Sequence, residues 1–299
     1  MNVGIVGIGK LGSIHLRIYK EHSQIRNISL ADCDESKLLQ NKNLPGFLDY
    51  HKLIGRIDLV SIATPTSTHY EIARFFIKNK IPVLVEKPLA SNYQEARKIV
   101  DFADKNKTLL VVGHVERHNN AYLAVKKILK TPLFIECHRL SCYPYRSLDV
   151  SVVLDLMIHD LDIILDLVKD TPKKVEAKGV KVLSKSVDIA NVRITFSKGC
   201  VANITASRIS AKKERKIRIF MPRCYVSLDY AEQEVEIYEK TKNGINKKAL
   251  HIQKEEPLKK EISEFINLVR SKKFTLEYAK SAKNALGLAL KIQNIIAKP

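Results

Sequence analysis

A glycine-rich turn near the start of the chain constrains the fold more than any other feature. Gly7-Ile8-Gly9-Lys10-Leu11-Gly12 follows the apolar stretch Asn2–Gly7, which is typical of a strand, and leads into a helical pattern over Lys10–Tyr19. Glycines at this spacing permit a tight turn, let backbone amides approach a pyrophosphate, and allow close packing of helix on strand. The segment therefore predicts the phosphate-binding turn of a dinucleotide-binding unit, with all six residues as cofactor contacts.

An acidic residue completes the expected cofactor site. Asp32 ends the second apolar stretch, Ile28–Asp32, about 20 residues beyond the last glycine, where a carboxylate can accept both ribose hydroxyls of an adenosine. No arginine lies beside Asp32 to receive a 2′-phosphate, although Lys37 follows shortly after it. The sequence therefore predicts NAD as the cofactor, with NADP less favoured.

A hydroxyl-rich segment, Thr64-Pro65-Thr66-Ser67-Thr68-His69, follows the apolar stretch Leu59–Ala63. An ordinary strand-to-helix turn, with a hydroxyl capping the next helix, is one interpretation. The position at the carboxyl end of a strand also suits a wall of the cofactor site. We expect cofactor contacts from Thr64, Pro65, Thr66 and His69, and no catalytic role for His69.

A charged pair and a proline, Glu86-Lys87-Pro88, end the apolar stretch Val83–Glu86. The common interpretation of such a pattern is a buried strand followed by a solvated turn. However, ligands bind at the carboxyl ends of strands in open α/β sheets, and Pro88 restricts Lys87 to extended conformations. We therefore expect Lys87 to join the cofactor and substrate sites, and Glu86 to contact the cofactor.

Apolar stretches alternate with helical patterns over residues 1–115. The expected strands are Asn2–Gly7, Ile28–Asp32, Leu59–Ala63, Val83–Glu86 and Leu109–Gly113. The expected helices are Lys10–Tyr19, Asp34–Asn41, Thr68–Asn79 and one that Ser91-Asn92-Tyr93-Gln94 opens as a capping box. This alternation predicts a doubly wound parallel sheet, and hence a dinucleotide-binding Rossmann domain over residues 1–117.

Beyond about Arg117 the pattern changes to strands in which polar and apolar residues alternate. The expected strands are Phe134–Leu140, Asn191–Phe196, Val201–Ser207, Lys216–Phe220 and Glu234–Tyr238, and the expected helices are Asn120–Leu129, Val150–Val168, Leu258–Val269 and Tyr278–Ala297. Alternation predicts an open, mainly antiparallel sheet with one buried face. We therefore expect an α/β chain whose second domain, residues 118–299, is an α+β domain for substrate binding and oligomerisation. Packing of the final helix back on the first domain is an alternative.

The helix expected over Val150–Val168 carries a narrow polar stripe. Asp155, His159, Asp162 and Asp166 share one face, whereas the rest of the helix is apolar nearly all round. Buried charges need partners or a cavity, so the stripe is either a structural network or a site. In the second interpretation His159 is a general base that Asp155 orients.

The segment before this helix, Arg139-Leu140-Ser141-Cys142-Tyr143-Pro144-Tyr145-Arg146, combines two arginines with two tyrosines. A surface loop after a strand is one interpretation. Arginine also suits phosphate oxygens, and a tyrosine ring can cover a sugar or a base. We expect Tyr143 and Arg146 to bind a nucleotide-sugar substrate.

Charge and composition restrict the class of protein. The chain has 51 Lys and Arg against 32 Asp and Glu, a net charge of +19, which suits nucleic acid or an anionic small substrate. The basic residues are scattered, so we expect no nucleic-acid partner.

No apolar run approaches the roughly 20 residues of a membrane helix, and the first strand leaves no room for a signal peptide. Five cysteines without a Cys-x-x-Cys spacing fit the cytoplasm and predict no metal site.

These pieces together resemble the Gfo/Idh/MocA family of oxidoreductases, which includes glucose–fructose oxidoreductase and inositol dehydrogenase. The resemblance covers the whole chain through Gly7–Gly12, Thr64–His69, Glu86-Lys87-Pro88 and the pair Asp155/His159. It implies that Lys87, Asp155 and His159 form the catalytic group beside the nicotinamide and contact the substrate. It also implies a homodimer or homotetramer formed through the C-terminal sheet.

One branch of the family is similar in more detail. Gly113-His114-Val115-Glu116-Arg117-His118-Asn119 is similar to a Gly-His-x-Glu-Arg-Phe-Asn segment of the UDP-N-acetylglucosamine 3-dehydrogenases, and Arg117 becomes an expected substrate contact. Ser151 and Met157 depart from glycines that many members carry. The branch implies NAD-dependent oxidation of a sugar 3-hydroxyl to a ketone. The alternatives are a dehydrogenase of another sugar or a cyclitol such as inositol, and a non-catalytic NAD-binding regulator.

Overall fold

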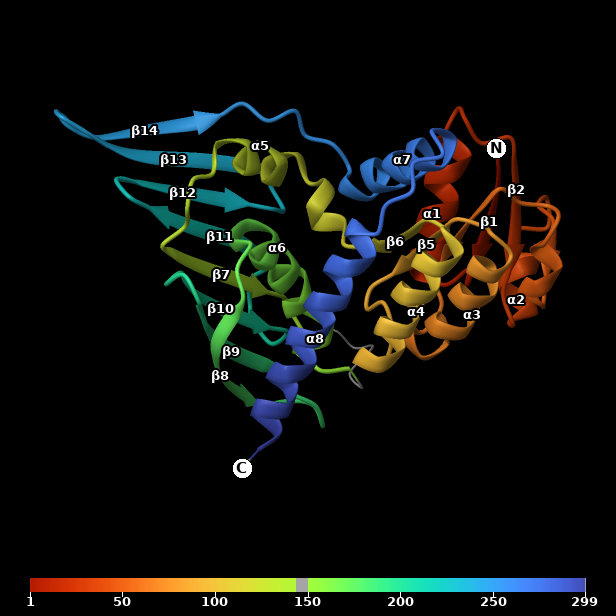
Figure 1. The fold of residues 1–299 in the computed structure, drawn as a ribbon, viewed down its shortest axis with the longest axis horizontal. Helices are drawn as coiled ribbons and strands as arrows, with labels where there is room; N and C mark the ends of the chain where they lie inside the picture. Colours follow the sequence, from red (N-terminus) through yellow and green to blue (C-terminus); the bar gives the residue numbers. More distant parts are fainter. Residues whose placement is uncertain (144–149, 299) are drawn as a thin grey trace. The chain divides into compact units, whose positions relative to one another are not determined.

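The computed structural model describes residues 1–143 and 150–298, and its contacts divide the chain into two compact units (Figure 1). Unit 1 comprises Met1–His114 with Leu258–Lys283, and unit 2 comprises Val115–Pro257 with Asn284–Pro299. The chain therefore crosses between the units more than once, whereas the sequence pattern suggested a single boundary after residue 117.

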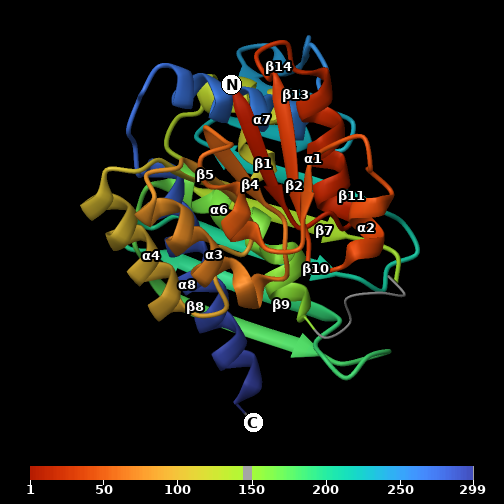
Figure 2. The same cartoon turned by 90° about the vertical axis from the view of Figure 1, so that its right-hand side faces the viewer.

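Unit 1 is built on a six-stranded parallel sheet with strand order β3-β2-β1-β4-β5-β6 (Figure 2). Its strands are β1 (Asn2–Val6), β2 (Asn27–Ala31), β3 (Gly46–Phe47), β4 (Leu59–Ile62), β5 (Val83–Glu86) and β6 (Leu110–Gly113). This sheet confirms the parallel Rossmann-like fold. The two-residue strand β3 was not expected, because it is too short to show a period.

Helices cover both faces of this sheet. They are α1 (Lys10–Glu21), α2 (Glu35–Leu39), α3 (Thr66–Lys78), α4 (Tyr93–Asn106) and α7 (Pro257–Arg270), and α8 (Glu277–Ala297) begins in this unit. α1 and α7 share one hydrophobic cluster, in which Leu16 and Ile18 of α1 and Phe265 of α7 pack with Ile5 and Leu84 of the sheet. α3 and α4 pack on each other on the other side of the sheet (Figure 2).

The helix boundaries follow local capping chemistry. Asn92 caps α4, because its side chain accepts a hydrogen bond from the N–H of Glu95. The expected capping box at Ser91 was therefore wrong by one residue. Pro257 begins α7, as expected for a proline in the first helical turn.

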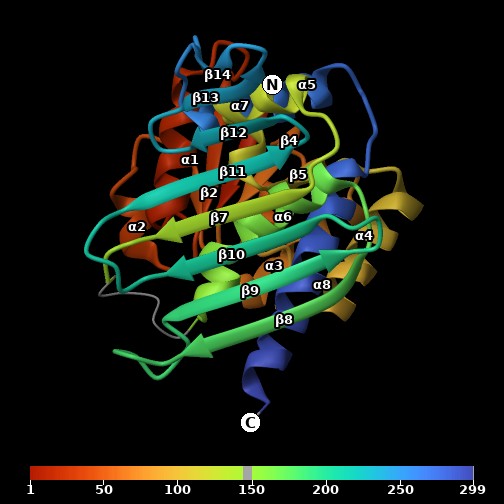
Figure 3. The same cartoon turned by 90° about the vertical axis from the view of Figure 1, so that its left-hand side faces the viewer.

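Unit 2 contains an eight-stranded sheet with strand order β14-β13-β12-β11-β7-β10-β9-β8 (Figure 3). Its strands are β7 (Phe134–Leu140), β8 (Pro172–Val180), β9 (Ile189–Phe196), β10 (Val201–Ser207), β11 (Glu214–Met221), β12 (Cys224–Asp229), β13 (Glu234–Thr241) and β14 (Gly244–Leu250). β7 and β10 are parallel and the other neighbours are antiparallel, which confirms an open, mainly antiparallel sheet.

Strands β8, β12 and β14 were missing from the expectations. β8 and β14 are edge strands rich in lysine, and within the described sheet β8 pairs with β9 and β14 pairs with β13. Charged residues on an edge strand discourage pairing with other chains. β14 is exposed over nearly its whole length and has little apolar alternation, whereas Val175 and Ala177 of β8, and Val226 and Leu228 of β12, do alternate with polar residues and were overlooked. Pairing with β13, rather than a hydrophobic pattern, decides the conformation of β14.

One face of this sheet carries helices and the other carries none in the part of unit 2 that the structure describes (Figure 3). The helices are α5 (Asn120–Ile128), α6 (Ile158–Val168) and the part of α8 from Asn284 onward. α5 contacts β12 and β13, and α6 contacts β7. No helix among the described residues is both long and apolar enough to span a membrane.

Candidate active site

The glycine turn lies in unit 1 where the strand order reverses, between β1 and β4. Gly7 has φ of +87°, and an added Cβ would lie 2.8 Å from the carbonyl oxygen of Ala63. A Cβ on Gly12 would overlap the carbonyl oxygen of Gly7. At Gly9, which precedes α1, a Cβ would meet no atom within 4 Å. Open space therefore faces the N-terminus of α1, and this arrangement fits the pyrophosphate of a dinucleotide.

Asp32 follows β2 and lies beside the glycine turn. Its Oδ2 accepts a hydrogen bond from the backbone N–H of Ile8 at 2.6 Å, and its Oδ1 accepts one from Asp34 at 2.9 Å. The Lys37 ammonium lies 3.5 Å from Oδ1. The structure thus brings together the carboxylate and the glycine turn that the spacing linked, and it adds a cation beside the carboxylate.

The hydroxyl-rich segment begins where β4 ends. The Thr64 methyl carbon would be 2.8 Å from a Cβ on Gly7, so Thr64 lies next to the glycine turn. His69 is buried, with Nδ1 2.8 Å from the carbonyl oxygen of Pro88 and Nε2 2.9 Å from that of Thr64. Burial lowers the pKa of His69, and the two carbonyl groups oppose this effect only in part. His69 therefore joins two loops of unit 1, while its cofactor contact stays a prediction.

Lys87 follows β5 and is half-buried. The preceding Glu86 is buried, and its Oε2 accepts a hydrogen bond from the backbone N–H of Lys87 at 3.3 Å. Its Oε1 lies 2.9 Å from Nε2 of His15. Burial raises the pKa of Glu86, but His15 and Lys87, through hydrogen bonds and charge, together outweigh it and leave the pKa below its ordinary value. A Cβ on Gly113 would lie 3.0 Å from this carboxylate, so only glycine fits there without a shift.

Sequence reasoning missed His15 as a site residue. It lies on the buried face of α1 with Leu16 and Tyr19, and its Nδ1 is 2.7 Å from the Ser61 hydroxyl of β4. The available signal was a histidine three positions after the last glycine of the turn, on a helix face that is otherwise apolar. Periodicity alone cannot distinguish such a residue from a core histidine whose ring nitrogens are hydrogen-bonded for structural reasons only.

The catalytic helix expected in unit 2 is not a continuous α-helix. The predicted helix is present from Val152 to Val168, but Val153–Met157 form a π-helical turn, and the α-helical part α6 begins at Ile158. Asp155 lies in the π turn and His159 at the start of α6. Both side chains are half-buried, and Nδ1 of His159 is shielded from solvent. Single π turns are rare and occur often at functional sites.

The predicted polar stripe divides into two parts. Arg117 binds Asp162 with two hydrogen bonds, from Nε to Oδ2 at 2.5 Å and from Nη2 to Oδ1 at 2.9 Å. Asp166 accepts hydrogen bonds from Tyr122 and Lys126. Burial lowers the pKa of Arg117, but Asp162 outweighs it and keeps the guanidinium charged. Asp162 and Asp166 therefore belong to a structural network, and a substrate contact of Arg117 stays a prediction.

A second buried ion network lies on α6. Arg139 of β7 donates to Asp160 with Nε and Nη2, both at 2.9 Å, and to Glu116 with Nη1 at 3.0 Å. All three side chains are buried. Arg139 is therefore part of a structural network, and of the two arginines in the Arg139–Arg146 segment only Arg146 is an expected phosphate contact.

The other residues expected to bind the substrate lie around the same segment. Tyr143 ends the described part of it, and its hydroxyl donates to the carbonyl oxygen of Leu183 at 3.4 Å. Arg146 lies outside the described residues. Among the residues that are described, no group of three or more His, Cys, Asp or Glu side chains could hold a metal ion.

Both parts of the chain match known families. Residues 1–114 match an oxidoreductase family with an NAD-binding Rossmann fold, the GFO/IDH/MocA family. Residues 138–227 match the GFO/IDH/MocA C-terminal domain.

Two named relatives are informative. A UDP-N-acetylglucosamine 3-dehydrogenase from Acidithiobacillus ferrooxidans is 30% identical over 301 residues, which cover 98% of this chain and 96% of that protein. The solved structure of that enzyme has a TM-score of 0.92 and covers 99% of this chain and 97% of its own. A myo-inositol 2-dehydrogenase from Thermotoga maritima is 25% identical over 70% of this chain and 69% of its own length.

Proposed function

This chain belongs to the GFO/IDH/MocA family of NAD-binding oxidoreductases, and from that premise we propose that it oxidises the 3-hydroxyl of UDP-N-acetylglucosamine to a ketone. The observation that carries this proposal is the 30% identity to the Acidithiobacillus ferrooxidans enzyme over nearly the full length of both proteins. The similarity to the inositol dehydrogenase covers a smaller part of the chain and favours a cyclitol as the second candidate.

Three side chains would carry the chemistry. His159 is the base that takes the hydroxyl proton, and Asp155 orients its ring. The ammonium of Lys87 stabilises the alkoxide that develops as the proton leaves. The half-buried state of all three supports these roles, since a reacting side chain must be accessible yet partly shielded from water. NAD, when bound, supplies the acceptor for the hydride.

NAD rather than NADP is the proposed cofactor. Gly9 and the N-terminus of α1 would hold the pyrophosphate, and Asp32 the adenosine ribose. The carboxylate of Asp32 disfavours a 2′-phosphate by like charge, although Lys37 lies 3.5 Å from it and weakens that repulsion. We expect the remaining contacts from Thr64, Pro65 and Thr66, next to the glycine turn.

A nucleotide sugar is the proposed substrate class. Arginine binds phosphate oxygens in a fork geometry, which supports Arg146 as the diphosphate contact, and Tyr143 as a neighbouring contact. Arg146→Ala should raise KM for UDP-N-acetylglucosamine about tenfold with a smaller change in kcat. This is the effect of losing a contact that binds the ground state and the transition state equally.

The deciding experiment compares oxidation of three compounds at matched concentration by NADH absorbance. UDP-N-acetylglucosamine should be oxidised faster than free N-acetylglucosamine and myo-inositol. Faster oxidation of myo-inositol would favour the cyclitol alternative. Equal rates with the free sugar and the nucleotide sugar would contradict a role for the diphosphate.

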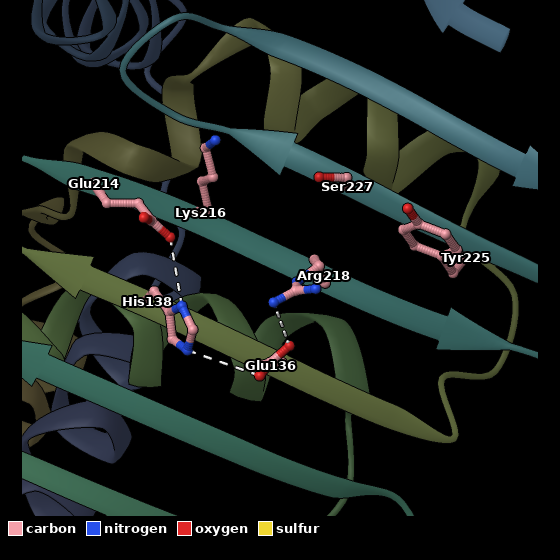
Figure 4. Close-up of a pocket in the computed structure, with 7 residues that line it drawn as sticks. All are labelled: Glu136, His138, Glu214, Lys216, Arg218, Tyr225 and Ser227. Carbon is pink, nitrogen blue, oxygen red and sulfur yellow. Dashed lines mark ion pairs between the residues drawn. The ribbon is translucent and has the colours of Figure 1, made fainter. Parts of the chain in front are cut away.

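A second copy of the chain is the proposed partner of the helix-free face of the eight-stranded sheet. Charges of both signs meet on this face: Arg218 pairs with Glu136 at 2.9 Å, and Nδ1 of His138 lies 3.4 Å from Glu214 (Figure 4). Beside them four rings cross neighbouring strands, with centroids 4.4 to 5.6 Å apart. These rings are Phe134, Phe220, Tyr225 and Tyr238. A face that mixes aromatic rings with both charges can complement itself across a two-fold axis.

A further inference from the structure

Two buried histidines flank the backbone of Lys87, and neither belongs to the reacting group described above. We propose that His15 and His69 are positioning residues that fix the Lys87 backbone from its two sides, each from an element that also builds the cofactor site. This rests on the proposed function, in which Lys87 takes part in the reaction. Their effect on turnover therefore passes through the lysine.

His15 acts on the amino side of Lys87. It lies on α1, the helix that the glycine turn opens, and its side chain is fully buried. The ring contacts Ser61 through Nδ1 at 2.7 Å and Glu86 through Nε2 at 2.9 Å. The second oxygen of Glu86 accepts the backbone N–H of Lys87. Buried hydrogen bonds are strong in a low dielectric, so this chain of contacts fixes where the backbone leaves β5.

His69 acts on the carboxyl side of Lys87. It lies on α3, and its Nδ1 is 2.8 Å from the carbonyl oxygen of Pro88, the residue after Lys87. Its Nε2 is 2.9 Å from the carbonyl oxygen of Thr64, which lies beside the glycine turn. The ring therefore lies between the lysine loop and a second segment of the expected cofactor site. A neutral imidazole carries one N–H, so it donates to one of the two carbonyl oxygens, and the tautomer with the proton on Nδ1 donates to Pro88.

The lysine depends on such support because its ammonium lies at the end of a flexible four-carbon stem. Once the cofactor and substrate are bound, the reach of the ammonium depends on where the Lys87 Cα lies. A displacement of about 1 Å at a reacting group can cost about 10²-fold in rate. Since both histidines attach to cofactor-binding elements, they also keep the lysine in register with the cofactor.

Paired substitutions separate the hydrogen bond from the volume of the ring. A glutamine side-chain nitrogen can replace Nε2 of histidine, whereas an asparagine nitrogen can replace Nδ1. At position 15 the contact toward Lys87 uses Nε2, so His15→Gln should keep kcat within about threefold and His15→Asn should lower it about tenfold. At position 69 the contact uses Nδ1, so His69→Asn should keep kcat and His69→Gln should lower it about tenfold. A purely structural role predicts that the larger glutamine is tolerated better at both positions.

A double-mutant cycle with Lys87→Ala tests whether these effects pass through the lysine. We would measure kcat with UDP-N-acetylglucosamine, the NAD Kd and the Tm of each variant, below its unfolding temperature. His15→Asn and His69→Gln should lower kcat in the wild-type background but change it less than about twofold in the Lys87→Ala background.

The outcomes distinguish the two proposals. Two results would overturn the positioning proposal and leave the role of Lys87 intact. The first is a further loss of kcat, about tenfold, when His15→Asn or His69→Gln is added to Lys87→Ala. The second is a kcat that does not favour Gln over Asn at position 15 and Asn over Gln at position 69. Unchanged turnover in Lys87→Ala itself would overturn the proposed role of the lysine, and the positioning proposal with it.

Discussion

At the scale of single residues, Asp32 is the residue that we propose sets the choice between the two nicotinamide cofactors. We expect tighter binding of NADH than of NADPH, because the buried carboxylate repels a 2′-phosphate. Asp32→Ser should lower the ratio of the Kd for NADPH to the Kd for NADH about tenfold, as measured by fluorescence titration. Asp104→Ser, which removes an exposed carboxylate of α4, serves as the control and should leave the ratio unchanged. Equal affinities in the unmutated protein would contradict the assignment.

The side chains proposed to react, His159 and Lys87, give a second prediction at this scale. His159→Ala and Lys87→Ala should each lower kcat by about 10² or more, the scale of general acid–base catalysis. His159→Ala should retain the Kd for NAD within about twofold, because His159 lies outside the Rossmann unit. Isothermal titration calorimetry measures the Kd for NAD, and the absorbance of NADH measures the turnover. Near-normal turnover in His159→Ala would assign the base to another residue.

At the scale of elements, buried arginines hold α6 within unit 2. Arg139 is buried between Asp160 and Glu116, so Arg139→Met leaves two uncompensated buried carboxylates and should lower the free energy of unfolding by about 3 kcal/mol. Arg17→Met removes an exposed i,i+4 pair with Glu21 and should cost less than about 0.5 kcal/mol. Urea denaturation measures both variants. Equal losses would show that burial of the Arg139 network contributes nothing.

The same helix predicts a pH dependence. Burial raises the pKa of Asp166, but Arg117, Lys126 and Tyr122 outweigh it and leave the pKa below its ordinary value. A carboxyl whose folded pKa is lowered adds stability above its unfolded pKa, about 4, and loses it as the pH falls through the folded pKa. The stability advantage of the wild type over Asp166→Asn, measured by urea denaturation, should therefore be full at pH 6 and shrink below about pH 4. A constant difference between pH 6 and pH 2.5 would contradict this.

At the scale of the whole molecule, the helix-free sheet face gives a prediction about assembly. The wild type should be a homodimer or a larger homo-oligomer by light scattering, and Tyr225→Lys should shift it toward the monomer, because a lysine would interrupt the row of stacked rings. Tyr93→Lys, on exposed α4 in unit 1, is the control and should leave the mass unchanged. A monomeric wild type would contradict the proposed interface.

The sequence by itself determined the features that depend on neighbouring residues. The glycine turn, Asp32 and the strand before Lys87 were all predictable, because tight turns and strand periodicity are local requirements of the backbone. The parallel sheet of unit 1 and the mainly antiparallel sheet of unit 2 followed from the same local patterns. The edge strand β14 did not, since its residues show little alternation of polar and apolar side chains.

Only the tertiary structure decided which polar side chains are tied into the fold by partners from distant segments. Glu86 lies 71 residues from His15, and Asp162 lies 45 residues from Arg117, so no local pattern links them. The polar stripe that includes Asp155 and His159 looked uniform in sequence, yet in the structure Asp162 pairs with Arg117 and Asp155 lies in a π turn. Burying a charge is costly without a partner, and where the partner lies is a property of packing between distant segments.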